Sequence, residues 1–233
     1  MTKKTGRITG ASLSRLSLMA LGAALCACAS TAQRDASASS PKNAAGTAAA
    51  IELTPASEPA PHPSWDSPPD FGAFREAYGR RADFHQICET DRPVEAYSKA
   101  FDAGDFDAAA TLALQWLDRC PVDAEAHWWA SNALDKAGKQ SEADIHWAWF
   151  AGLADSALLS GDGDKPATAI VTISIAEEYA ALKRLRMTPV DQTLITSPAM
   201  LDKFTVTNSR GTQQTVYFNP RLHFLRLRAR LQP

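Results

Sequence analysis

The side chains best able to do chemistry lie around a glycine-rich turn. Ser160-Gly161-Asp162-Gly163-Asp164 holds two carboxylates in a short loop, and an acidic and a phenolic side chain follow it. We predict a ligand-binding group made of Asp162, Asp164, Glu178 and Tyr179. Converging carboxylates can exchange protons with a substrate, as in a hydrolase. The structural interpretation is that the glycines simply end the preceding helix.

We expect neither a metal nor a cofactor. The turn fails the spacing of an EF-hand loop, because Pro166 stands where a third ligand belongs and no Glu completes the loop. The histidines are scattered along the chain: His62, His85, His127, His146 and His223. The sequence has no HExxH pair, phosphate-binding loop or Gly-x-Ser-x-Gly turn. We therefore favour a protein that is not an enzyme.

Cys28 ends a short apolar run that indicates where the protein is located. A basic segment leads into Leu16 to Ala27, which is too short to span a bilayer and is typical of a secretory signal. The residues around Cys28 resemble the lipobox of bacterial lipoproteins, with Leu25 three positions earlier and a small residue just before it. We predict a lipoprotein signal peptide over 1–27 and lipidation of Cys28. The alternative is ordinary secretion with cleavage before Ser30.

The resemblance to sorted lipoproteins extends to Ala29. Because an acidic residue does not follow the cysteine, that resemblance implies the outer membrane, with the protein facing the periplasm. The chain has 24 Lys and Arg against 26 Asp and Glu, and four of the basic residues fall in the first 27 positions, so the remainder carries a formal charge near −6. This balance argues against nucleic acid and leaves the lipid anchor as the expected membrane contact.

Composition predicts one folded domain behind a tether. Residues 28–68 are rich in Ala, Ser and Pro and have few large apolar side chains, so we predict a disordered tether. The remaining residues, 69–233, have the length of a single domain. We divide this domain into a helical half, 69–160, and a half with strands, 161–233.

The helical half carries an internal repeat. Ala103-Gly104-Asp105 recurs as Ala137-Gly138-Lys139, a spacing of 34 residues. Each copy predicts an antiparallel helical hairpin in which glycine makes the turn. The pattern resembles the tetratricopeptide repeat, although Asp155 replaces the closing proline of the second copy.

This hairpin geometry predicts a disulfide. Cys88 precedes the first helix and Cys120 ends the second, and these two positions lie side by side in an antiparallel hairpin. After acylation of Cys28 they form an even pair in an oxidising compartment. The alternative is two buried thiols.

Tryptophans on the helix after Cys120 suggest a binding face. In tetratricopeptide-like hairpins the first helix lines the concave surface, and Trp128, Asn132 and Asp135 share one side of that helix. We predict partner binding there, with another envelope protein or a peptide as the partner. We favour, for the tryptophans as a group, the simpler interpretation that they fill the core.

The second half predicts a strand, a helix, a hairpin and a final helix. Ala169 to Ile175 alternates as a half-buried strand, and Ser174 to Glu177 forms a capping box. Two strands around Asn208 to Gly211 complete a small antiparallel sheet of three strands. The fold class is therefore α+β, with one intervening and one C-terminal helix. We expect the arginines at 226, 228 and 230 to form a solvated face of that last helix.

Several short segments resemble an uncharacterised bacterial family, domain of unknown function 4919. They are Phe74 to Tyr78, Ser160 to Gly163, Thr168 to Ser174, Glu177 to Tyr179 and Tyr217 to Asn219. The resemblance covers about 69–231 and implies an envelope protein without catalytic residues to transfer. Our hypothesis is a non-enzymatic, protein- or peptide-binding envelope lipoprotein. The alternative is a hydrolase-like envelope enzyme that uses the carboxylates near the 160–164 turn.

Overall fold

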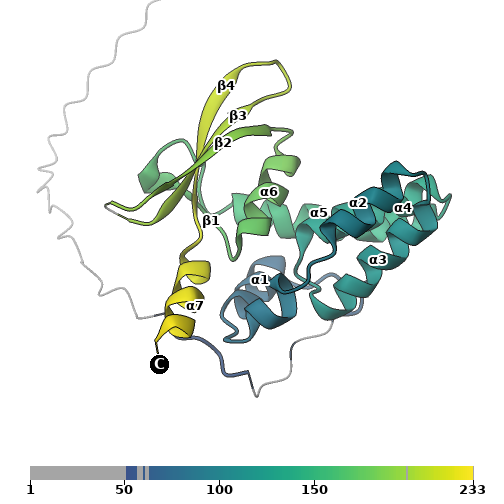
Figure 1. Cartoon of the computed structure of the whole chain (residues 1–233), viewed down its shortest axis with the longest axis horizontal. Coiled ribbons are helices and arrows are strands. Elements are labelled where there is room, and N and C mark those ends of the chain that lie inside the picture. Colours follow the sequence, from purple (N-terminus) through teal and green to yellow (C-terminus); the bar gives the residue numbers. More distant parts are fainter. Residues whose placement is uncertain (1–50, 57–59, 61–62, 198, 233) are drawn as a thin grey trace, which may run out of the picture. The chain divides into compact units, whose positions relative to one another are not determined.

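A computed structural model describes residues 51–56, 60, 63–197 and 199–232 (Figure 1). The predicted signal peptide and Cys28 lie outside these residues. None of the helices within the described ranges is long and apolar enough to cross a membrane.

The first half is helical, as predicted. It contains five α-helices and a π-helical turn, η1: α1 (Phe71–Gly79), η1 (His85–Glu89), α2 (Val94–Asp102), α3 (Phe106–Arg119), α4 (Ala124–Lys136) and α5 (Gln140–Leu158). Helices α2 to α5 form two consecutive hairpins, and α1 packs against α5 (Figure 1).

The repeated glycines make the turns of both hairpins. Gly104 and Gly138 have φ values of +78° and +77°, in the left-handed region that side chains disfavour. Asp105 and Asp123 begin α3 and α4, where each side chain accepts a hydrogen bond from a backbone N–H of the first turn. The helical hairpins are thus confirmed, while their kinship to tetratricopeptide repeats stays a prediction.

The predicted disulfide is present. Cys88 in η1 and Cys120 at the end of α3 are bonded, with their Cα atoms 5.1 Å apart. Both residues are buried. The bond closes a loop of 32 residues and ties η1 to the first hairpin, which in the loop-entropy model stabilises the fold by about 3–4 kcal/mol.

Two stretches that the sequence assigned to the tether contact the domain. Thr54 exchanges backbone hydrogen bonds with Arg80 and Ala82, at 2.8 and 2.9 Å. The Trp65 ring lies 5.0 Å, between ring centroids, from that of Trp149 on α5, and the Trp149 Nε1–H donates to the Trp65 carbonyl at 2.9 Å. The domain therefore gathers contacts from residues before position 69.

The second half carries a mixed sheet of four strands instead of the predicted antiparallel sheet of three. Its elements are a 3₁₀ turn, η2 (Pro166–Thr168), β1 (Ile170–Val171), α6 (Ile175–Arg184), β2 (Thr188–Ile195), β3 (Leu201–Thr207), β4 (Gln213–Asn219) and α7 (Arg221–Leu231). The strand order is β1-β4-β3-β2. Strand β1 is only two residues long and runs parallel to β4, while the other neighbours are antiparallel.

Strand β2 is the element that the sequence did not reveal. Seven of its eight residues are exposed, so it lacks the alternation of apolar and polar residues that predicts a strand. Pro189 lies at its second position, and the pairing with β3 is irregular between Pro189 and Asp191. Proline is tolerated there because β2 is an edge strand.

One face of the sheet packs on α6. Phe204, Val206, Val216 and Phe218 are buried in a cluster that includes Leu182 of α6. The predicted cap of α6 is confirmed, because the Ser174 hydroxyl accepts from the Glu177 N–H at 3.2 Å. The Glu177 carboxylate reaches back one residue further than expected, to the Ile173 N–H at 2.7 Å.

Candidate functional site

The predicted ligand-binding residues lie in different surroundings. Asp162 and Asp164 are exposed, and the Asp162 carboxylate accepts from the Asp164 N–H at 2.9 Å and from the Thr168 hydroxyl within its own turn. The Tyr179 hydroxyl donates to Gln192 of β2 at 2.9 Å. The fourth member, Glu178, is fully buried.

Glu178 faces a second buried carboxyl group. Asp202 at the start of β3 is 5 % exposed and lies close enough to influence Glu178, one carboxyl oxygen of which accepts from the Thr172 hydroxyl at 3.3 Å. Burial and then the charge of Asp202 raise the pKa of Glu178 to about 9. At neutral pH Glu178 is therefore protonated.

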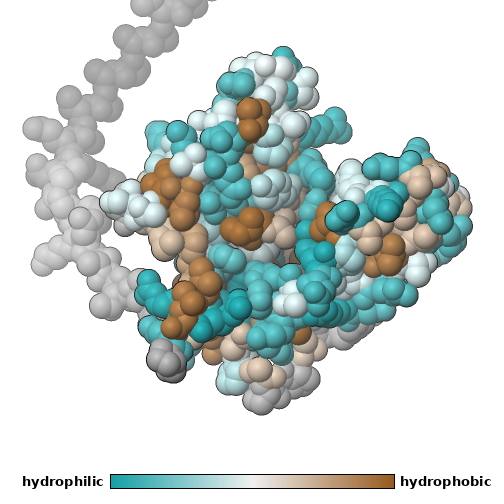
Figure 2. All heavy atoms as spheres, viewed as in Figure 1, coloured by the Kyte–Doolittle hydropathy of each residue, from teal (hydrophilic) through white to brown (hydrophobic). Residues whose placement is uncertain are grey.

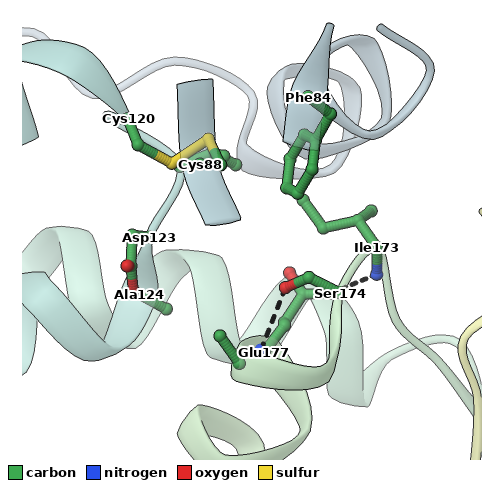
Figure 3. Close-up of a pocket in the computed structure, with 10 residues that line it drawn as sticks. Phe84, Cys88, Cys120, Asp123, Ala124, Ile173, Ser174 and Glu177 are labelled. Carbon is green, nitrogen blue, oxygen red and sulfur yellow. Dashed lines mark hydrogen bonds between the residues drawn. A yellow bond between two sulfur atoms is a disulfide. The ribbon is translucent and has the colours of Figure 1, made fainter. Parts of the chain in front are cut away.

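A water-sized hollow lies at the junction of the two halves (Figure 3). The disulfide and Phe84 line one side, and the starts of α4 and α6 line the other. Its volume of about 10 Å³ is near the lower limit for a single water molecule. It is too small for a substrate.

The carboxylates around this hollow are held in ion pairs. The Asp123 carboxylate accepts hydrogen bonds from Arg92 Nε at 2.6 Å, from Trp116 Nε1 at 2.7 Å and from the Ala126 N–H at 3.1 Å. Burial alone would raise the pKa of Asp123, but Arg92 and these hydrogen bonds outweigh it and lower the pKa below its usual value. Across the hollow, Glu177 of α6 pairs with Arg75 of α1 at 2.5 Å, with both side chains buried. These ion pairs therefore have a structural role, because they hold α6 to α1 and the start of α4 to the segment before α2.

The expectation that Arg226 belongs to a solvated face is wrong. Its side chain is buried, and it donates to the carbonyl oxygens of Gly79 and Ile173. Its guanidinium carbon lies 4.0 Å from the centroid of the Phe84 ring. The alternating arginines gave no sign of this, because the accepting carbonyls are far away in the sequence.

The predicted partner-binding residues share one side of α4. Trp128 and Asn132 are half-buried, and Asp135 is exposed. The Asn132 side chain donates to the Trp128 carbonyl at 2.6 Å. Lys183 of α6 places its Nζ 4.6 Å from the centroid of the Trp128 ring, so α6 partly covers this face. These residues neighbour one another, but none of them lines the hollow at the junction of the two halves or the groove beside His146 that is described below.

A buried histidine pair lies deeper in the helical half. His127 of α4 and His146 of α5 have their Nδ1 atoms 2.9 Å apart, and both are buried. Burial and then His146 lower the pKa of His127 to about 3, and burial lowers that of His146 to about 4. Both rings are thus neutral at physiological pH.

The hydrogen bonds of the pair fix the positions of its protons. The Pro121 carbonyl, 3.1 Å from His127 Nε2, can only accept, so that nitrogen carries the proton. In a neutral ring His127 Nδ1 must then accept from His146 Nδ1–H. Nε2 of His146 is then the nitrogen without a proton.

An apolar groove runs beside this pair, between α3 and α5. Its volume is about 410 Å³, and its lining is Trp65, Asp66, Leu114, Glu142, Ile145 and His146. Leu114, Ile145 and Trp65 are half-buried, whereas Asp66 and Glu142 are exposed. The groove therefore joins apolar walls to an acidic rim. Among the described residues, no group of three or more His, Cys, Asp or Glu side chains could hold a metal ion.

Comparison with known families gives one match. The chain matches the family described as Domain of unknown function (DUF4919) over residues 72–223. The chain belongs to this family. No curated protein and no solved structure matches it.

The DUF4919 match spans the histidine pair but begins after Trp65. Sequence reasoning missed the pair because the two residues are 19 positions apart. A signal was nevertheless present. His127 is spaced three and seven residues before Ala130 and Leu134, and His146 lies three after Ala143 and four before Phe150. This is the spacing of residues on the buried side of a helix. Each histidine therefore stands where an apolar residue is expected.

Proposed function

We propose that this member of the DUF4919 family is a lipid-anchored, non-enzymatic protein of the bacterial cell envelope that binds a protein or peptide partner. The observation that carries the proposal is the groove between α3 and α5, which is large enough for one or two partner side chains. The carboxyl groups best suited to catalysis are instead held in ion pairs or buried, as with Asp123 and Glu178.

The groove indicates the chemistry of the partner. Trp65, Leu114 and Ile145 offer apolar walls, and Asp66 and Glu142 add negative charge at the edge. A segment with an apolar anchor next to Lys or Arg would satisfy both features. The face with Trp128, Asn132 and Asp135 is the competing location.

Site-specific photo-cross-linking in cells distinguishes the two locations. A photoreactive residue at Glu142 on the groove rim should give a discrete adduct, and one at Asp135 should give little. Lys165, exposed in the 160–168 turn, is the control position. Ile145→Glu should abolish the Glu142 adduct, while Thr111→Glu, an exposed site on α3, should leave it unchanged. An adduct from Asp135 alone would move the site to α4.

The lipid anchor has its own test. Cells fed labelled palmitate should label the wild-type protein, and Cys28→Ser should remove the label. An unlabelled wild-type protein would support ordinary secretion instead.

A further inference from the structure

The surface around α7 combines exposed apolar side chains with arginines. Leu227 is 39 % exposed and Leu231 is 75 % exposed, and Met200 beside them is 38 % exposed. Two adjoining hollows, of about 520 and 280 Å³, share Met200, Phe224 and Arg228 in their linings. Figure 2 shows hydrophobic atoms gathered over this helix.

The charge here is opposite to that of the protein as a whole. Helix α7 contains four arginines and no Asp or Glu, and Arg221, Arg228 and Arg230 are exposed. No acidic residue is among those that line the two hollows. A cationic apolar surface on an otherwise acidic chain favours an anionic, apolar partner.

The path of the chain adds a second, independent observation. Ile51 is half-buried and lines the larger hollow beside α7. Only 23 positions separate it from Cys28, and a flexible chain of that length spans on average about 26 Å. A domain of this size is about 40 Å across. An anchor at Cys28 would therefore keep the face that contains Ile51 close to the bilayer.

We propose that the α7 face, formed by Met200, Phe224, Leu227, Arg228, Arg230 and Leu231, docks onto the anionic surface of the membrane to which Cys28 is anchored. The inference rests on the proposed lipid anchor and deepens it. The leucines would enter the interfacial layer, and the arginines would pair with phosphate groups. Docking would leave the α3–α5 groove available to a partner.

Vesicle binding by the full mature chain with Cys28→Ser tests the face without the acyl anchor. We expect the protein to cosediment with vesicles of phosphatidylethanolamine and phosphatidylglycerol, and much less with phosphatidylcholine vesicles. Leu227→Asp with Leu231→Asp should lower the partition coefficient by more than about tenfold. Arg228→Gln and Arg230→Gln should each lower it by about fivefold, and added salt should do the same.

The controls are an exposed apolar residue and an exposed arginine elsewhere. Trp147→Asp on α5, where Trp147 is 48 % exposed, and Arg210→Gln in the β3–β4 turn should not change vesicle binding. If the leucine variant loses its circular dichroism signal, the arginine variants decide the question alone, because they change only exposed groups.

Three outcomes would overturn the proposal. They are no binding to phosphatidylglycerol vesicles, equal binding by wild type and the α7 variants, and a dimer in sedimentation that the leucine substitutions dissociate. The last would assign the face to a second copy of the chain. The anchor and the face can fail separately, since palmitate labelling reports on Cys28 and vesicle binding reports on α7.

Discussion

Asp123 in the helical half and Glu178 beside the sheet are both buried carboxyl groups, yet their charges differ. Asp123 is ionised, because Arg92, the Trp116 ring N–H and the Ala126 N–H all donate to it. Glu178 is protonated, because burial and then the neighbouring acid Asp202 outweigh the hydrogen bond from the Thr172 hydroxyl, which favours the ionised form. Burial by itself would raise the pKa of both groups, so the difference between them comes from their neighbours.

The comparison indicates that the two halves respond to pH in opposite directions. The histidine pair of the helical half is neutral in the fold and can take up protons when the chain unfolds, so that half is weakened by acid. Glu178 is protonated in the fold and releases its proton on unfolding, so its half is weakened by alkali. Replacing a buried carboxyl group by an amide should therefore destabilise the protein at Asp123 and stabilise it at Glu178 when the pH is neutral or higher.

The largest effect is expected from Asp123→Asn. The substitution keeps the shape of the side chain but removes one of the two carboxylates that pair with the half-buried Arg92, leaving only Glu125, and it gives up one charge-assisted cap of α4. Breaking a buried pair in this way costs about 3–5 kcal/mol. Urea denaturation at neutral pH measures it.

Asp118→Asn is the matched control, because Asp118 is exposed near the end of α3. It should change the free energy of unfolding by less than about 0.5 kcal/mol. A loss at Asp123 no larger than this would show that the Arg92 pair contributes nothing to the junction.

An intermediate effect of opposite sign is expected from Glu178→Gln. The amide can accept from Thr172, as the acid does, and it carries no charge beside Asp202. Because the folded-state pKa is raised to about 9, the wild type loses stability as pH rises from about 4.5 to about 9, by about 1.4 kcal/mol per pH unit. Gln abolishes this loss, which amounts to about 5 kcal/mol at pH 8, but its second amide N–H is buried at a cost of about 1–3 kcal/mol, so we expect a net gain of about 2–4 kcal/mol at pH 8.

The control for this change is Glu95→Gln, at an exposed position on α2. Its pH dependence of stability should be that of the wild type. If Glu178→Gln instead destabilised the protein equally at pH 5 and pH 8, the residue would be ionised in the fold and the comparison with Asp123 would fail.

The features that could be predicted are those decided by neighbouring residues. The glycine turns, the Ser174 cap and the four helices from α2 to α5 follow from local chemistry, and Cys88 meets Cys120 because a hairpin brings its ends together. Strand β2 could not be predicted, because it is exposed on both faces and contains Pro189. It exists because β3 provides a pairing edge.

The same division applies to the candidate sites. That Trp128 and Asn132 lie together could be predicted because helical spacing places them on one side of α4, while their role in partner binding stays a prediction. The α3–α5 groove was not found, because Trp65 comes from a stretch whose composition resembles a linker and reaches α5 only in the folded chain. The burial of Arg226 likewise depends on carbonyl groups 53 and 147 positions away.

The smallest effect concerns the histidine pair and is seen only in acid. His146 has its pKa lowered to about 4 in the fold, against about 6.5 in an unfolded chain. The stability that depends on its neutral form is present above pH 6.5 and is lost as pH falls toward 4, by about 1.4 kcal/mol per pH unit. His146→Gln removes this ionisable group while its amide can still donate to His127. At pH 5.5 the variant should recover about 1.4 kcal/mol of the loss that the wild type suffers relative to pH 7.5. Denaturation curves at the two pH values measure the difference. An imidazole signal of His146 that titrates near pH 6.5 in the folded protein would refute it, because such a residue would bind its proton equally well folded or unfolded.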